Sequence, residues 1–357
     1  MENKKILFLT LGKENLASSR IRAYGYRSYL KNAGFDCRYI SYTTSFYHRS
    51  ITRGNNYLIK TVNKLYGYIS IFRLLWKVKA FDVIFIQRVL LSRHIFRLLR
   101  TLNPNVIFDF DDAVYLTDRY TRNGKSNKFL KRFDYIAKNS KVVITTQSFF
   151  NLSYAKSINK NVITLTTPVD TKRYFPMKRE IAKEGVVIGW IGSPSTTHYL
   201  NKLKNVFHLI SKKYPYVRFE FIGAEPFKLD GIKLIFKDWS IESEIEDLQN
   251  FDIGIMPLED DEWSRNKYYK LLQYFAVGIP AVVSAVGICR DIVDDGVNGF
   301  LAKDEDAWIN KISMLIENPE LRKRLGENGR EKAVSRYSYE ANSPILINLF
   351  QEMARER

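Results

Sequence analysis

The chain has 357 residues, 45% of them hydrophobic, and a formal net charge of +18 at pH 7. This length predicts two domains, each with its own core. The two cysteines lie far apart and the four histidines are scattered, which argues against a disulfide framework and a structural zinc site. The apolar run near the N-terminus is too short for a secretory signal, so we expect a cytoplasmic protein.

The positive charge is concentrated in the first half. Residues 1–178 contain 32 Lys and Arg against 10 Asp and Glu, whereas residues 179–357 contain 24 against 28. Eleven basic residues, one acidic residue and interleaved aromatic residues occupy Arg49–Arg100. This pattern suits docking on an anionic membrane surface. It also suits binding to nucleic acid or a basic, solvated helix pair.

The first half alternates apolar, β-branched segments with amphipathic ones. Such alternation is typical of an α/β domain, in which helices connect parallel strands. We expect strands at 6–10, 35–41, 81–87, 105–110, 141–146 and 162–165, and helices at 20–32, 55–77, 92–102 and after Ser148.

Polar side chains follow several of these strands, at the edge of a parallel sheet where ligands bind. We expect the side chains after the first and third strands to face a cleft, although the arginines also fit an ordinary surface. These residues are Ser18, Ser19, Arg20, Arg22 and Arg88.

The fourth strand ends in Asp109-Phe110-Asp111-Asp112. Carboxylates this close repel one another, so hydroxyls, cations or amides must lie nearby. We interpret Asp111 and Asp112 as partners for substrate hydroxyl groups. A metal site and a turn cap are the alternatives.

Residues 166–176 contain proline and charged residues without any period, which indicates a connection between domains. We expect an N-terminal domain at 1–166, a linker at 167–185, a second domain at 186–335 and a final helix at 336–357. The second domain repeats the alternation. Its expected strands are 186–191, 218–222, 234–236, 251–256 and 281–286, and the expected helices are 198–212, 241–248, 267–277, 305–317, 319–335 and 344–357.

Residues 251–300 carry the strongest functional signal. A strand, an acidic loop, a helix and a second strand follow one another, which places the loop and the helix N-terminus at the ligand-binding edge. Backbone N–H groups at the helix start, with Lys267 and Lys270, suit a diphosphate. Tyr269 and Gln273 share a helix face with Lys270, so Gln273 can reach a neighbouring sugar hydroxyl.

An uncharged run at 271–289 has the length of a membrane span. Gly278 and Pro280 divide it into a short helix and a strand, so we expect a buried core instead. Trp239, after the third strand of the second domain, either stacks on a base or packs in that core.

The sequence KLLQYFAVGIPAVVS at 270–284, followed by IVDDGVNGFL at 292–301, resembles the donor-binding half of the family-four (group 1) glycosyltransferases. The resemblance implies an α/β protein with the GT-B fold, in which two Rossmann-like domains face a central cleft. It also implies that the final helix at 336–357 packs back on the N-terminal domain. In that family one glutamate contacts the ribose and another the transferred sugar. Gln273 and Arg265 occupy these positions.

Gln273 can still bind ribose, but Arg265 cannot accept a hydrogen bond from a sugar. We therefore assign the second role to the acidic loop Glu259, Asp260 and Asp261, which otherwise is simply solvated.

The resemblance assigns roles to the remaining candidates. Catalysis would rest on electrostatic stabilisation of a departing diphosphate, without metal or cofactor. The implied catalytic residues are Asp111, Asp112, Lys267 and Lys270. The implied donor-binding residues are Gly192, Ser193, Trp239, Glu259, Asp260, Asp261, Arg265, Tyr269 and Gln273, and the implied acceptor-binding residues are Ser18, Ser19, Arg20, Arg22 and Arg88.

The function implied is retaining transfer of a hexosyl group from a nucleotide-sugar to a lipid-linked saccharide, in cell-surface polysaccharide biosynthesis. The protein would act at the inner face of the cell membrane, as a peripheral protein, and not on nucleic acid. A sugar-nucleotide epimerase of the same fold and a basic nucleic-acid-binding protein are the alternatives.

Overall fold

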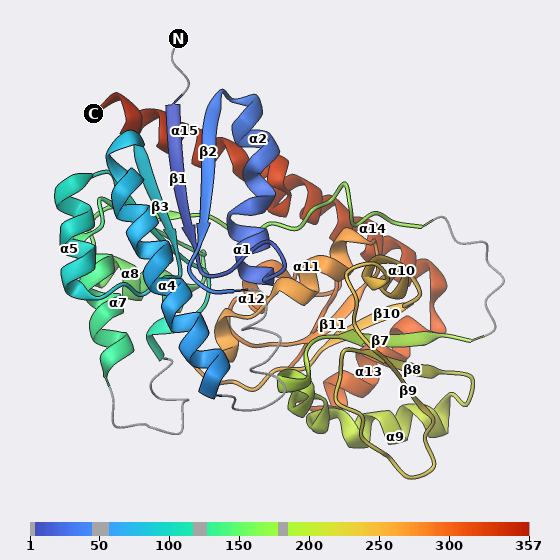
Figure 1. Ribbon diagram of the computed structural model, residues 1–357. Coiled ribbons are helices and arrows are strands. Elements are labelled where there is room, and N and C mark those ends of the chain that lie inside the picture. Colours follow the sequence, from blue (N-terminus) through green and yellow to red (C-terminus); the bar gives the residue numbers. More distant parts are fainter. Residues whose placement is uncertain (1–3, 45–56, 117–126, 178–184, 357) are drawn as a thin grey trace. The chain divides into compact units, whose positions relative to one another are not determined.

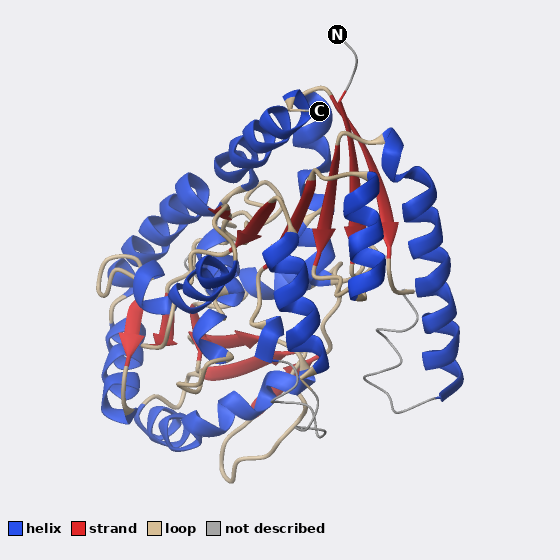
Figure 2. Ribbon diagram, turned by 90° about the vertical axis from the view of Figure 1, so that its left-hand side faces the viewer, coloured by secondary structure: helices blue, strands red, loops and turns tan. Residues whose placement is uncertain are grey.

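The computed structural model describes residues 4–44, 57–116, 127–177 and 185–356. The chain folds into two compact units: unit 1 contains residues 1–168 and 342–357, and unit 2 contains residues 169–341. Each unit is built on a six-stranded sheet with helices packed against it (Figures 1 and 2).

The sheet of unit 1 is parallel throughout, with the order β2-β1-β3-β4-β5-β6. Its central strands are runs of β-branched and aromatic residues that are buried on both faces, as expected where helices cover a parallel sheet. The strands are β1 (Lys4–Thr10), β2 (Phe35–Ser41), β3 (Val83–Gln87), β4 (Val106–Phe110), β5 (Val142–Thr145) and β6 (Val162–Thr164).

The helices of unit 1 depart from the prediction at one point. The single helix expected at 20–32 is wrong, because the chain leaves the α conformation at Ala23 and forms two short helices joined by a 3-10 turn. Residues 55–56 of the helix expected at 55–77 lie outside the described residues. The helices are α1 (Ala17–Arg22), η1 (Tyr24–Tyr26), α2 (Arg27–Asn32), α4 (Tyr57–Lys77), η2 (Val78–Ala80), α5 (Arg93–Leu102), η3 (Val114–Leu116), α7 (Lys128–Asn139) and α8 (Phe149–Ile158).

Unit 2 has the parallel sheet order β12-β11-β10-β7-β8-β9. Close approach explains two glycines in its strands, since a Cβ on Gly189 or Gly254 would overlap the ring of Phe251 or Tyr274. The strands are β7 (Val187–Ile191), β8 (Arg218–Ile222), β9 (Leu234–Lys237), β10 (Ile253–Met256), β11 (Ala281–Ser284) and β12 (Phe300–Ala302). The edge strand β12 was not predicted.

The first helical segment of unit 2 is 3-10 rather than α, so the helix expected at 198–212 is two elements. Asp304 and Asn318 each accept a backbone N–H at a helix start, as N-caps do. The helices are η4 (Pro194–Leu203), α9 (Lys204–Lys213), α10 (Glu244–Gln249), η5 (Ser264–Asn266), α11 (Tyr269–Ala276), α12 (Cys289–Ile292), α13 (Glu305–Glu317) and α14 (Pro319–Tyr337).

The chain passes between the units at positions other than the expected ones. Residues 169–177 of the expected linker belong to unit 2, where the Gln249 amide donates to the carbonyl of Phe175 and Arg330 donates to the carbonyl of Thr171. Residues 178–184 lie outside the described residues.

The last helix, α15 (Tyr339–Arg355), enters unit 1 at residue 342. Phe350 packs edge-on against Phe8, Phe35 and Phe85, and Asn105 donates to the carbonyl of Met353. The C-terminal segment is therefore part of the core of unit 1. Among the helices described, none is both long and apolar enough to cross a membrane.

Candidate functional site

Lys270 is the most unusual charged residue of unit 2. Its ammonium lies 4.0 Å from the ring centroid of Trp190 and 3.4 Å from Thr196 Oγ1. Within the described residues it forms no ion pair. Burial, with a smaller contribution from Lys267, lowers its pKa from 10.5 to about 7. Lys270 is half-buried. Partial burial of an amine without a counter-ion is costly, and its natural complement is an anionic ligand.

Gly192 lies beside this amine, after the end of β7. A Cβ at this position would be 2.6 Å from Lys270 Nζ and 2.2 Å from the Trp190 ring, so only glycine leaves the amine and the ring in place. Ser193 then begins η4 with a capping box that involves Thr196, and its hydroxyl lies 2.9 Å from that of Ser195. A glycine loop with several hydroxyls thus borders the lysine.

The start of α11 carries two more of the predicted residues. Lys267 Nζ lies 5.3 Å from the centroid of the Trp263 ring, and its backbone N–H donates to the carbonyl of Ser264. Tyr269 is half-buried at the first position of α11. No side chain caps this helix N-terminus by a hydrogen bond, and its dipole adds to the positive potential there.

Gln273 does not point to an open site, which corrects the prediction. It is 4% exposed, and its amide donates to Glu244 Oε1 at 2.9 Å and lies 3.3 Å from the Tyr174 hydroxyl. The physical reason is the buried carboxylate of Glu244, which needs hydrogen-bond donors, and the Gln273 amide provides one.

Glu244 itself was missed by the sequence analysis. Besides Gln273, it accepts hydrogen bonds from the Tyr174 hydroxyl and from the indole N–H of Trp239, the latter at 2.9 Å. Trp239 is 41% exposed, so the alternative of a core tryptophan is wrong. Its ring is fixed by the carboxylate and remains accessible.

The carboxylates of the acidic loop are hydrogen-bonded or paired with neighbouring residues. Glu259 pairs with Lys202 at 2.6 Å and Asp260 with Arg265 at 2.7 Å. Asp261 accepts the backbone N–H of Ser264, which starts η5. The Arg265 hydrogen bond lowers the pKa of Asp260. These contacts brace the loop, and its binding to the sugar stays a prediction.

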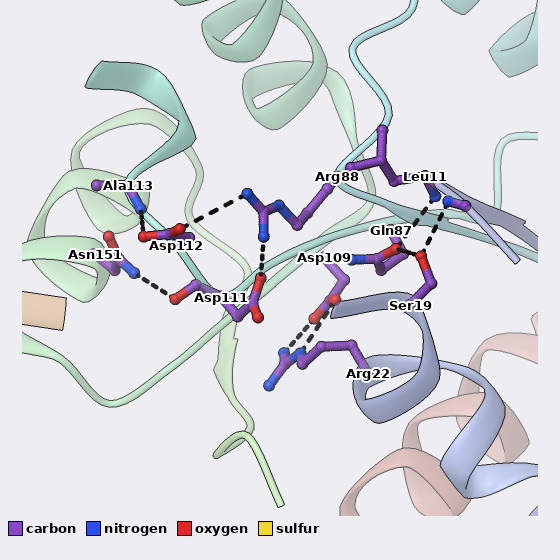
Figure 3. A network of polar contacts seen from close by, with 11 residues as sticks. Leu11, Ser19, Arg22, Gln87, Arg88, Asp109, Asp111, Asp112, Ala113 and Asn151 are labelled. Carbon is purple, nitrogen blue, oxygen red and sulfur yellow. Dashed lines mark hydrogen bonds and ion pairs between the residues drawn. The ribbon is translucent and has the colours of Figure 1, made fainter. Parts of the chain in front are cut away.

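In unit 1, Arg22 and Ser19 are buried, which corrects the expectation that both face a cleft. Arg22 forms a fully buried, bidentate pair with Asp109 (Figure 3). It also donates to the carbonyl of Leu165 at 2.8 Å. Ser19 donates to Gln87 Oε1 at 2.9 Å. Their role is structural, because Asp109 lies in the core and its charge must be compensated.

Arg88 is the centre of the accessible part of this edge. It has a φ of 59°, which is uncommon for a residue with a side chain. Its guanidinium lies 3.5 Å from Asp111 and 3.8 Å from Asp112 (Figure 3). The three side chains are 16–25% exposed. The carboxylates at the end of β4 therefore have cationic partners. Arg88 neutralises Asp111 and Asp112, and Arg22 neutralises Asp109.

The other predicted residues of this edge are peripheral. Ser18 and Arg20 are half-buried, and Arg20 lies 3.5 Å from the carbonyl of Glu14. The sequence analysis did not identify Gln87. In the structure its Nε2 is buried and lacks a hydrogen-bond partner within the described residues. A strand-end glutamine gives no recognisable sequence signal. Within the described part of the chain no group of three or more His, Cys, Asp or Glu side chains is arranged to hold a metal ion.

Comparison with known proteins adds a family and a fold. Residues 269–332 match the profile of the family described as "Glycosyl transferases group 1". An uncharacterized glycosyltransferase of Methanocaldococcus jannaschii is 44% identical over 77 residues, which make up 21% of this chain and 22% of that protein. The match therefore spans about a fifth of the relative and is local to one segment.

Two solved structures match over nearly the whole chain. Sucrose-phosphate synthase from Thermosynechococcus elongatus has a TM-score of 0.71 at 13% identity and covers 99% of this chain and 100% of its own. HepE from Anabaena, solved in complex with UDP-glucose, has a TM-score of 0.64 at 13% identity and covers 99% and 98%. Identities this low establish the fold alone.

Proposed function

We propose that this chain, a group 1 glycosyl transferase with the GT-B fold, transfers a sugar from a nucleotide-sugar donor to a saccharide acceptor, with retention of the anomeric configuration. The observation that carries the proposal is Lys270. It is a half-buried amine beside a glycine loop, without an ion-pair partner within the described residues. A diphosphate provides the negative charge that such an amine lacks.

The donor diphosphate would bind between the Gly192 loop and the start of α11. Lys270 would donate to a phosphate oxygen, with Thr196 and Ser193 as hydroxyl partners. Lys267 and the α11 dipole would add positive potential. When the bond to the sugar breaks, negative charge develops on the diphosphate, and these groups stabilise it in the transition state. The departing phosphate oxygen can take the proton of the acceptor hydroxyl, so no protein base is required.

The nucleoside would lie against Trp239. The exposed face of this ring suits stacking on a base, and Glu244 fixes the ring through the indole N–H. The carboxylate of this region is then Glu244. The Gln273 amide donates a hydrogen bond to it and holds it in place. The HepE complex with UDP-glucose makes a uridine diphosphate sugar the first donor to test.

The acceptor would bind at the strand ends of unit 1. Asp111 and Asp112 can accept hydrogen bonds from sugar hydroxyls, and Arg88 holds both carboxylates in place. We propose a lipid-linked saccharide as the acceptor, in cell-surface polysaccharide biosynthesis at the inner face of the cell membrane. The support for this choice is the excess of basic residues in the first half of the chain.

A thermal-shift screen tests the donor site directly. A nucleoside diphosphate or nucleotide-sugar that binds only the folded protein should raise the melting temperature as its concentration rises. The Lys270→Met variant should lose this shift, whereas Lys212→Met, an exposed lysine of α9, should keep it. If none of uridine, guanosine and adenosine diphosphate raises the melting temperature of the wild type, the proposed donor site is wrong. Turnover of a nucleotide-sugar without any acceptor would indicate an epimerase instead.

A further inference from the structure

The helix α4 has an apolar stripe on its outer side. Val62, Leu65, Ile69, Phe72 and Trp76 recur at intervals of three and four residues, which places them on one helix face. Their exposed fractions are 55%, 61%, 50%, 66% and 79%. The helix has 21 residues, or about 30 Å at the usual rise. Large apolar side chains exposed in such a continuous row mark an interaction surface.

The opposite side of α4 is already packed. Asn63, Gly67, Ser70, Ile71 and Leu74 are buried. The Asn63 carboxamide accepts the backbone N–H of Thr44, and the Ser70 hydroxyl donates to the carbonyl of Ser41. A Cβ on Gly67 would lie 3.2 Å from the ring of Tyr42. The helix is thus held against the β2 side of the unit 1 sheet, and this packing turns the stripe outward.

The charges around the stripe identify its complement. The helix contains Lys60, Lys64, Arg73 and Lys77 and no acidic residue. At 100° per residue, Arg73 and Lys77 follow one border of the stripe, and Lys64 lies beyond the other. Tyr68, which is 56% exposed, adds an aromatic side chain at that second border. An apolar row with aromatic residues and basic flanks matches the boundary between headgroups and acyl chains of an anionic bilayer.

A second copy of this chain is a poorer complement. Its α4 would bring the same positive charge and no carboxylate to pair with it, and the bulk of Phe72 and Trp76, whose rings are 6.2 Å apart, does not suit a close helix pair. We therefore propose that α4 lies in the plane of an anionic membrane, with the stripe in the acyl boundary and the basic residues among phosphate headgroups. Membrane binding extends the proposed function, in which the acceptor is lipid-linked, but the evidence for it comes from α4 alone.

Vesicle binding tests the surface without any substrate. Vesicles of phosphatidylglycerol and phosphatidylcholine should bind the wild type, and pure phosphatidylcholine should bind it much less. Phe72→Ser and Trp76→Ser should each lower the partition coefficient about tenfold. The pair Arg73→Gln and Lys77→Gln should lower it about 30-fold at low salt and much less at about 0.5 M salt, where charges are screened.

Matched controls lie in unit 2. Met314→Ser removes a side chain that is 47% exposed on α13, and Lys212→Glu reverses a charge on α9. Both should leave vesicle binding unchanged. Trp76 is the one tryptophan of five that lies in unit 1, so the fluorescence blue shift on binding should disappear in Trp76→Phe. Melting temperatures exclude misfolding as the cause of any loss.

Three outcomes would overturn the proposal: a wild type that ignores anionic vesicles at low salt, stripe variants that bind as the wild type does, and a dimer that Phe72→Ser and Trp76→Ser convert to monomer. The last result would assign the stripe to a second copy. A thermal shift with nucleoside diphosphate, measured on the same variants, keeps failure of the membrane surface distinguishable from failure of the donor site.

Discussion

Replacing Lys270 by methionine removes an ammonium while keeping an unbranched side chain over Trp190. A charge-assisted hydrogen bond to a phosphate contributes about 1.5–3 kcal/mol. The dissociation constant of a nucleoside diphosphate should therefore rise about 10- to 150-fold. The variant should also be more stable than the wild type without ligand, by about 1 kcal/mol at pH 6, because it loses a half-buried cation that has no carboxylate partner among the described residues.

The titration of Lys270 gives the same site a pH signature. Its pKa is about 7 in the folded protein against 10.5 for an ordinary lysine. Between these values the unfolded chain binds more protons, so Lys270 makes the free energy of unfolding rise with pH. A bound diphosphate favours the charged amine and raises its pKa again. Binding then takes up a proton above pH 7, and the affinity should fall by up to about 50-fold from pH 7 to 9.

Titration calorimetry at pH 8, in buffers of different ionisation enthalpy, measures both effects. The wild type should show a binding enthalpy that depends on the buffer, and Lys270→Met should not. Lys212→Met serves as the control, since it also removes one lysine charge but lies on an exposed helix. Equal affinities for wild type and Lys270→Met, or a wild-type enthalpy independent of buffer, would refute the assignment of Lys270 to the diphosphate.

Three further predictions follow from buried contacts. Gln273→Glu should lower the free energy of unfolding by about 1–3 kcal/mol at pH 7, measured by chemical denaturation, because it places a second buried carboxylate beside Glu244. Adding Glu244→Gln should recover most of this loss. An unchanged stability of the single variant would contradict the contact between residues 273 and 244. Arg22→Met should lower the free energy of unfolding by about 3–5 kcal/mol, because it leaves Asp109 buried without its cation. The double variant Arg22→Met with Asp109→Leu should lose less stability. A loss in the double variant as large as in the single one would show that the unpaired carboxylate is not the cause. Gly192→Ala should displace Lys270 and weaken diphosphate binding in a thermal-shift titration, and an unchanged shift would mean that the loop adapts.

The sequence by itself determined the architecture, whereas the kind of site stays a prediction. The alternation of apolar strands with helices predicted α/β domains with parallel sheets, which the structure confirms. The GT-B fold was implied by the family resemblance, and the matched folds confirm it. These signals are local, since strand length, helix period and turn residues lie within about twenty positions of one another. The recognition of a group 1 glycosyl transferase from residues 270–301 is also confirmed. Lys270 could be selected from its place at a helix start, because that place depends only on neighbouring residues.

Tertiary structure alone decided which polar groups face one another. Gln273 and Glu244 are 29 residues apart, and Arg22 and Asp109 are 87 apart, so no local pattern indicates that each is a buried partner of the other. The same holds for the stripe of α4. Apolar residues occupy both sides of this helix, and a helix period by itself does not say which side packs on the sheet. The contacts of Asn63, Gly67 and Ser70 decide it, because small and hydrogen-bonding side chains allow the close approach that turns Phe72 and Trp76 outward.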